Sequence, residues 1–122
     1  MYKLLAILFA ASFLNTSNPE IGFDDDKYNF GKVKLNGMVT HTFIVYNRGD
    51  QPLILTKVVP SCGCAVASFT KEPIKPGAQG EIAVKFNTKY RPLGFSLKTF
   101  TVFSNSKNAP HTIWLKGEIT KN

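Results

Sequence analysis

The stretch that decides the fold is EIAVKF, at residues 81–86. Its apolar side chains Ile82, Val84 and Phe86 point to one side of an extended chain, and the residues between them point to the other. Such a period of two is typical of a β-strand with one buried face. The sequence therefore predicts a strand here, packed on a hydrophobic core.

Further short strands are predicted on both sides of this stretch. Runs rich in β-branched and aromatic residues lie at residues 39–47, 53–59, 65–69, 95–104 and 112–119. Turn residues separate them, and before residue 81 Pro76 fixes φ at one corner of a turn while Gly77 tolerates a positive φ at the next. No amphipathic helix is evident. The pattern predicts an all-β fold, an immunoglobulin-like antiparallel β-sandwich of about seven strands.

The same alternation predicts which side chains lie between the two sheets of such a sandwich. The expected core consists of Phe43, Val45, Leu53, Leu55, Ile82, Val84, Phe86, Phe100, Val102, Ile113 and Leu115. The opposite phase places Tyr46, Phe103 and Trp114 on the outer faces, where folding does not require large rings. These three residues are our candidates for binding a protein partner.

The N-terminal residues predict export. Met1-Tyr2-Lys3 gives a short positive start, and the apolar run LLAILFAASFL follows at residues 4–14. This is the pattern of a secretory signal peptide, and the run is too short for a membrane-spanning helix. We expect a signal peptide over residues 1–17, a linker over 18–22 and one sandwich domain over 23–122. The mature chain is then expected in the periplasm, at the outer membrane or outside the cell.

The chain of 122 residues is basic, with 15 Lys and Arg against 8 Asp and Glu. The lysines are scattered, and basic residues surround an aromatic ring only at Lys89-Tyr90-Arg91, which resembles a loop tip. Scattered lysines are typical of solvated faces and of edge strands that resist aggregation. We therefore predict no nucleic-acid partner.

The ordered set of these motifs resembles the bacterial DUF1573 family over residues 23–119. The resemblance is carried by FGKV at 30–33, FIVYNRG at 43–49, SCGC at 61–64, IKPG at 74–77, IAVKF at 82–86 and LKG at 115–117. It implies an immunoglobulin-like sandwich akin to the major-sperm-protein and ciliary ASH domains, exported in many bacteria. The family name records an unknown function, so the resemblance implies no reaction.

The cysteine pair Cys62-Gly63-Cys64 carries the chemistry that the sequence leaves open. Residues i and i+2 of a strand face the same side, so the two sulfurs lie close together. They could pack as small core residues, form a disulfide that export would favour, or hold Cu(I) as two soft thiolates. Without a nearby third ligand the copper signal is weak, and no other cofactor is expected.

Catalysis has little support in the sequence. His41 and His111 lack an acidic partner with an evident local role, and Asp24-Asp25-Asp26 lacks the spaced ligands of a calcium loop. Phosphate-binding loops, nucleophile elbows and paired-carboxylate motifs are absent. We therefore predict no enzyme but an exported, non-catalytic interaction module of the cell envelope. The alternative is a thiol redox or Cu(I)-binding protein that uses Cys62 and Cys64.

Overall fold

The computed structural model describes residues 17–121, so the predicted signal peptide lies outside the described residues except for Ser17. The described part consists of strands joined by turns, and it contains no helix that could cross a membrane. The strands are β1 (Ile21–Phe23), β2 (Lys27–Lys34), β3 (Met38–Asn47), β4 (Leu55–Pro60), β5 (Ala65–Phe69), β6 (Gln79–Asn87), β7 (Gly94–Ser104) and β8 (His111–Thr120).

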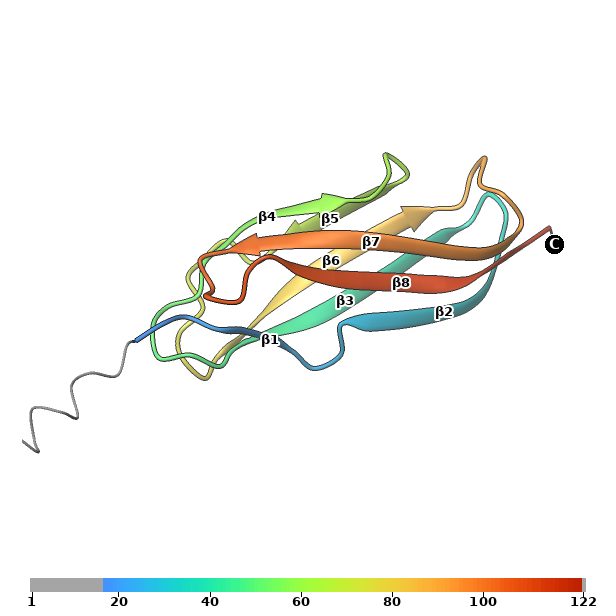
Figure 1. The fold of residues 1–122 in the computed structure, drawn as a ribbon. Helices are drawn as coiled ribbons and strands as arrows, with labels where there is room; N and C mark the ends of the chain where they lie inside the picture. Colours follow the sequence, from blue (N-terminus) through green and yellow to red (C-terminus); the bar gives the residue numbers. More distant parts are fainter. Residues whose placement is uncertain (1–16, 122) are drawn as a thin grey trace, which may run out of the picture.

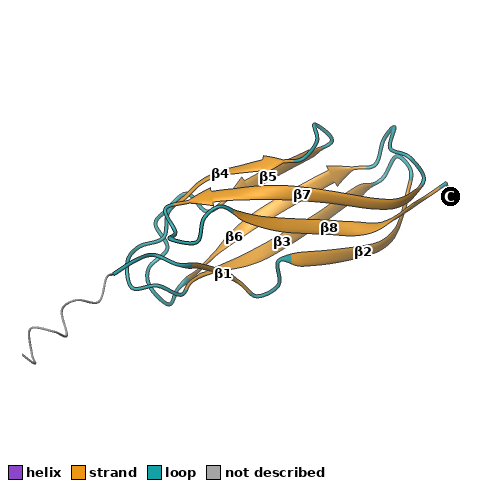
Figure 2. Cartoon of the chain, in the orientation of Figure 1, coloured by secondary structure: helices purple, strands orange, loops and turns teal. Residues whose placement is uncertain are grey.

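The strands form two four-stranded sheets that lie face to face (Figures 1 and 2). The first sheet has the order β1-β3-β6-β5 and the second sheet the order β2-β8-β7-β4. All neighbours are antiparallel except β2 and β8, which are parallel. The predicted immunoglobulin-like sandwich is confirmed, with eight strands in place of about seven.

The core between the sheets is the one that the alternation predicts. Each of the predicted core residues is at most 4% exposed, and Phe43, Phe86 and Phe100 are the largest among them. The predicted turn at Pro76-Gly77 is also present, with Gly77 at φ 78°. The period-two pattern therefore determines the inner faces of both sheets.

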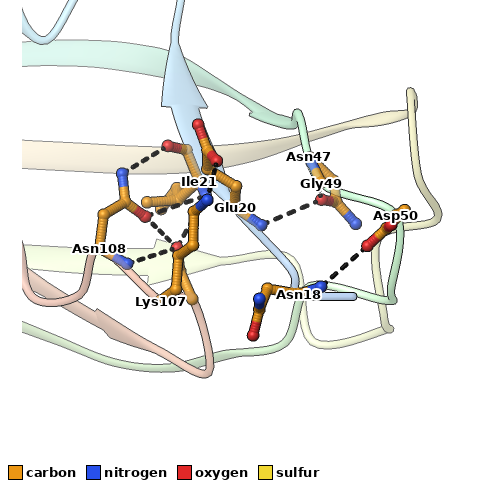
Figure 3. A network of polar contacts seen from close by, with 9 residues as sticks. Asn18, Glu20, Ile21, Asn47, Gly49, Asp50, Lys107 and Asn108 are labelled. Atoms are coloured by element: carbon orange, nitrogen blue, oxygen red, sulfur yellow. Dashed lines mark hydrogen bonds and ion pairs between the residues drawn. The ribbon is translucent and has the colours of Figure 1, made fainter. Parts of the chain in front are cut away.

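The start of the domain differs from the linker that we predict for residues 18–22. Ile21 is 3% exposed and belongs to β1, which pairs with the end of β3. Its amide donates to Ser106 Oγ at 2.9 Å, and its carbonyl accepts a hydrogen bond from Asn108 Nδ2 at 3.1 Å (Figure 3). The ion pair of Lys107 with Glu20, at 3.1 Å, holds the same segment. These polar contacts come from the loop between β7 and β8, which no local pattern connects to residue 21.

Asn47, at the end of β3, is a buried polar side chain that joins three segments (Figure 3). Its Nδ2 donates to the carbonyls of Gln51 at 2.6 Å and Ile74 at 2.9 Å. Its Oδ1 accepts from the amides of Gly49 at 2.9 Å and Glu20 at 3.4 Å. This side chain therefore fixes the end of the sandwich at which β1 begins.

The start of β4 differs from the prediction. The strand predicted from residue 53 begins at Leu55, because Leu53 instead pairs with Ile74 through two backbone hydrogen bonds of 2.9 and 2.8 Å.

Gly117 on β8 lies under the ring of Phe30. An added Cβ at this position would collide with that ring and lie 2.6 Å from the Gly31 carbonyl oxygen. Gly117 thus allows β2 to pack closely on β8.

Candidate functional site

The outer face of the second sheet carries two of the three predicted binding residues. Trp114 lies on β8 between the buried Ile113 and Leu115, and its side chain is half-buried on the outer face. Phe103 lies on the outer face of β7, where Lys57 Nζ is 4.8 Å from the ring centre. The pair of Thr101 and Thr112 separates the two rings along the strands, so Phe103 and Trp114 are not in adjacent positions.

Tyr46, the third predicted binding residue, lies elsewhere. It belongs to β3 in the first sheet, where it pairs with Gln79 and Gly22. Its buried neighbours Val45 and Asn47 point inward, so Tyr46 points outward from the first sheet. The structure therefore does not bring Tyr46 together with Phe103 and Trp114.

The sequence reasoning missed two exposed apolar residues on the same outer face as Trp114, of which Leu97 lies next to Trp114 and Phe95 lies beyond Leu97. Phe95 is 74% exposed and Leu97 is 44% exposed, both on the outer face of β7. Thr99 pairs with Trp114 and Leu97 with Lys116, so Leu97 is a diagonal neighbour of Trp114. We call Phe95, Leu97 and Trp114 the β7–β8 patch. Residues 95 and 97 share the odd-numbered phase of Phe103, and that signal was present in the sequence.

Lysines surround the β7–β8 patch. Lys116 pairs with Leu97, and Lys32 lies across from Glu118 on the neighbouring strand β2. Lys32, Lys116, Glu118 and Phe95 line a shallow depression of about 570 Å³. No ion pair of Lys32 or Lys116 exists within residues 17–121. The patch is thus an apolar surface whose border carries two lysines and one glutamate, a net positive charge.

A disulfide joins Cys62 and Cys64 in the loop between β4 and β5. The two Cα atoms are 5.2 Å apart, and the Cys64 amide donates to Cys62 Sγ at 3.2 Å. The Cys64 carbonyl accepts the Asn87 amide at 2.9 Å, which fixes the loop to β6. Both cysteines are half-buried against the core, so packing and disulfide formation coexist here. In this oxidised state neither sulfur is a thiolate that could bind Cu(I).

A depression of about 490 Å³ opens beside this disulfide. Its apolar lining includes Cys64, Gly63, Met38, Val66 and Tyr90, of which Tyr90 is 81% exposed. Its basic lining consists of Lys85, Lys89 and Arg91. None of these three cations forms an ion pair with another residue of the described chain. The predicted loop tip at residues 89–91 is therefore one wall of a positive, partly apolar depression next to a disulfide.

The two histidines have structural contacts. His41 stacks on Tyr28 with ring centres 3.7 Å apart, and His111 stacks on Phe23 at 4.6 Å. Burial lowers the pKa of His41, although the charge of Asp25 acts in the opposite direction. His111 Nε2 also lies 3.2 Å from Asp26 Oδ2. Neither histidine lines the depression beside the disulfide.

The acidic run at residues 24–26 is exposed at its first two positions. Asp26 contacts Lys27 Nζ and His111 Nε2, each at 3.2 Å. Partial desolvation raises the pKa of Asp26, but these two hydrogen bonds and charges outweigh it, so that the pKa lies below its usual value. Within residues 17–121, no group of three or more His, Cys, Asp or Glu side chains is placed to hold a metal ion.

The family model of DUF1573, described as a protein of unknown function, matches residues 21–119. This range includes all eight strands except the last residue of β8. The chain belongs to the DUF1573 family. A comparison with curated proteins found no relative of this DUF1573 chain.

Solved structures resemble the DUF1573 domain in fold. A protein of unknown function from Porphyromonas gingivalis W83 aligns with a TM-score of 0.70 at 16% identity, over 86% of this chain and 50% of that one. The human CEP192 ASH/PapD-like domain 7 aligns at 0.65 and 9% identity, over 88% and 90%. The secreted serine protease VesC from Vibrio cholerae aligns at 0.61 and 16% identity, over 82% and 23%. The DUF1573 chain thus spans half of the first of these proteins and less of the protease.

Proposed function

We propose that this DUF1573 chain is an exported, non-catalytic protein-interaction module of the bacterial cell envelope. The observation that carries the proposal is the β7–β8 patch, Phe95, Leu97 and Trp114 with its positive border. These side chains point away from a core that is complete without them. The fold alone does not favour this function over another, because the same sandwich occurs in proteins with unrelated roles.

The composition of the patch indicates the kind of partner. Aromatic residues are enriched in protein interfaces, and a ring on a rigid strand loses little conformational entropy on binding. Lys32 and Lys116 lie beside the apolar side chains and form no ion pair within residues 17–121, although Glu118 lies across from Lys32. Charge complementarity therefore favours a protein surface with an apolar centre and an acidic rim.

Site-specific crosslinking in the native host tests this proposal. A photo-reactive amino acid at Phe95 or Leu97 is expected to crosslink one acidic envelope protein, and the same probe at Thr42 is the control. Thr42 is exposed on the outer face of the first sheet, on the other side of the molecule. The proposal requires that Lys32→Glu with Lys116→Glu abolish the crosslink. Equal crosslinking from Thr42 would contradict it.

Export is tested separately by N-terminal sequencing of the protein purified from its host. We expect the mature chain to begin close to residue 18, because a positive start and a short apolar run precede that point. Cell fractionation of the same preparation should place the protein in the envelope or the medium. A cytoplasmic protein that begins at Met1 would contradict the proposal.

A second candidate function, thiol redox or Cu(I) binding, rests on the Cys62–Cys64 disulfide. Reduction would release two thiolates within one short loop, and soft thiolates are ligands that Cu(I) prefers. A competition titration of the reduced protein with a Cu(I) chelator tests the copper part. We expect binding of one Cu(I) per chain if this candidate is correct, and Cys62→Ser should lose it. No uptake by the reduced wild-type protein would exclude copper.

A further inference from the structure

The depression beside Cys64 combines three features that no fold requirement explains. It is lined by Cys64 of the disulfide, by exposed apolar side chains and by three cations that form no ion pair within residues 17–121. Both cysteines are only half-buried, and a bridge between residues two positions apart closes a very short loop. Closing so short a loop removes little entropy from the unfolded chain. Stabilisation of the folded state therefore does not explain why this bridge is present.

We propose that Cys64 is the attacked sulfur of a thiol–disulfide exchange site, and that its reductant is a dithiol within an acidic peptide segment. The inference goes beyond the interaction module and does not depend on it. It rests on the second candidate function, thiol redox at Cys62 and Cys64, and specifies which sulfur is attacked and what charge the attacking peptide carries.

The geometry distinguishes the two sulfurs. Cys64 lines the depression, whereas Cys62 does not. The Cys64 amide is 3.2 Å from Cys62 Sγ, so it is placed to donate to the negative charge that Cys62 acquires as leaving group. Hydrogen bonds to a charged acceptor are stronger than those to a neutral one. Attack at Cys64 with departure of Cys62 is therefore the favoured direction.

The cations determine which thiol approaches. Lys85, Lys89 and Arg91 line the depression that contains Cys64, and none has an acidic partner in the described chain. The attacking species is a thiolate, so a positive site raises its local concentration. Acidic residues that flank the thiol add to this attraction. Val66 and Met38, 60% and 53% exposed, provide apolar contact for the same segment.

The exchange balances without another reactant. A thiolate of the peptide attacks Cys64 Sγ, a sulfur–sulfur bond forms between them, and the Cys62–Cys64 bond breaks with release of the Cys62 thiolate. The second thiolate of the peptide then attacks its own sulfur in this mixed disulfide and releases the Cys64 thiolate. The peptide dithiol loses two electrons and two protons to become a disulfide. The Cys62–Cys64 pair gains the two electrons and, at neutral pH, takes up protons from the buffer.

Kinetics with two synthetic dithiol peptides test the proposal. Both peptides contain the same two cysteines, flanked by glutamates in one and by lysines in the other. At low salt we expect the acidic peptide to reduce the oxidised protein at least about tenfold faster. Acid quenching followed by mass spectrometry should find the trapped peptide on Cys64. In single-cysteine variants, which have a free thiol, the reverse exchange is measured with the oxidised, disulfide form of the acidic peptide. The Cys64 thiol of Cys62→Ser should attack that disulfide and form the mixed disulfide faster than the Cys62 thiol of Cys64→Ser.

A matched pair of charge variants provides the control. Lys85→Gln with Lys89→Gln and Arg91→Gln removes the three cations of the depression and should abolish the preference for the acidic peptide. Lys71→Gln with Lys75→Gln and Lys121→Gln removes the same charge from exposed positions outside the depression and should preserve the preference. Circular dichroism confirms that both variants are folded. Equal rates for the two peptides, or a mixed disulfide on Cys62, would overturn the proposal. A disulfide that neither peptide reduces would exclude the redox candidate as a whole.

Discussion

At the scale of single residues, the stability of the domain depends on positions that leave no room for substitution. Gly117 is one of them, because the ring of Phe30 and the carbonyl of Gly31 occupy the space of a Cβ. Gly117→Ala is expected to lower the free energy of unfolding by about 1–3 kcal/mol through overpacking. Urea denaturation measures this change.

Gly63→Ala is the control for that substitution. No atom lies within 4 Å of a Cβ at Gly63, and its φ is not in the left-handed region. We expect its free energy of unfolding to stay within about 0.5 kcal/mol of the wild type, as for other surface substitutions. A similar loss for both variants would contradict the steric explanation.

Asn47 illustrates a second kind of sensitive residue, a polar side chain that the core cannot replace. Asn47→Ala removes two donated and two accepted hydrogen bonds, among them the buried one to the Ile74 carbonyl. The expected destabilisation is about 2–4 kcal/mol, measured by thermal or urea unfolding. Asn105 also bonds two backbone groups but is exposed, so Asn105→Ala should cost about 1 kcal/mol or less. A larger loss of stability in Asn105→Ala than in Asn47→Ala would contradict this explanation.

At the scale of a strand, substitutions on the inner face of β8 should lower the stability of the domain, whereas substitutions on its outer face should lower partner binding. Ile113 and Leu115 are fully buried, whereas Trp114 between them belongs to the outer face. Trp114→Ala should therefore weaken partner binding and retain a cooperative unfolding transition. Ile113→Ala should destabilise the domain by about 2–5 kcal/mol through a cavity. If Trp114→Ala unfolds the domain instead, Trp114 acts as a core residue and the β7–β8 patch loses its central ring.

The same strands show what the sequence could predict and what it could not. Alternation identifies Phe43 or Val84 as core because a side chain's face depends only on its parity within one strand. It does not identify β1, because Ile21–Phe23 is too short for a pattern and is held by Ser106 and Asn108, which are distant in sequence. The depression beside Cys64 escaped prediction for a similar reason. It joins residues of several strands and loops, including Met38, Lys85 and Arg91, which only the folded topology brings together.

At the scale of the whole molecule, titration links stability to pH. The pKa of His41 is lowered by burial, so the unfolded chain binds its proton more tightly than the folded chain. The lowered pKa of His41 therefore contributes to the stability of the fold above about pH 6.5, which is its pKa in the unfolded chain. This stability contribution is lost as the pH falls from 6.5 towards the lower pKa of the folded chain. Asp26, whose folded pKa is also lowered, loses its contribution further down, below its ordinary value of 3.8.

His41→Phe tests this prediction and retains an aromatic ring against Tyr28. We expect the wild type to lose stability between pH 7 and 5, and the variant to lose less of it over the same interval. Urea midpoints measured at each pH provide the comparison. Identical pH profiles for the two proteins would assign the loss to other groups.

The end at which the chain enters the sandwich determines where a tag or tether can be attached without covering the disulfide. The segment before β1 lies at one end of the molecule, and the loop with Cys62 and Cys64 lies towards the other end, where β8 also finishes (Figure 1). Strands such as β3, with ten residues, separate these ends by roughly 30 Å. A fluorescent protein or a sensor-chip tether joined ahead of residue 17 would be attached at the end away from the disulfide loop and would leave that loop open to the solution. A tag joined after residue 121 would instead be attached at the same end as the disulfide.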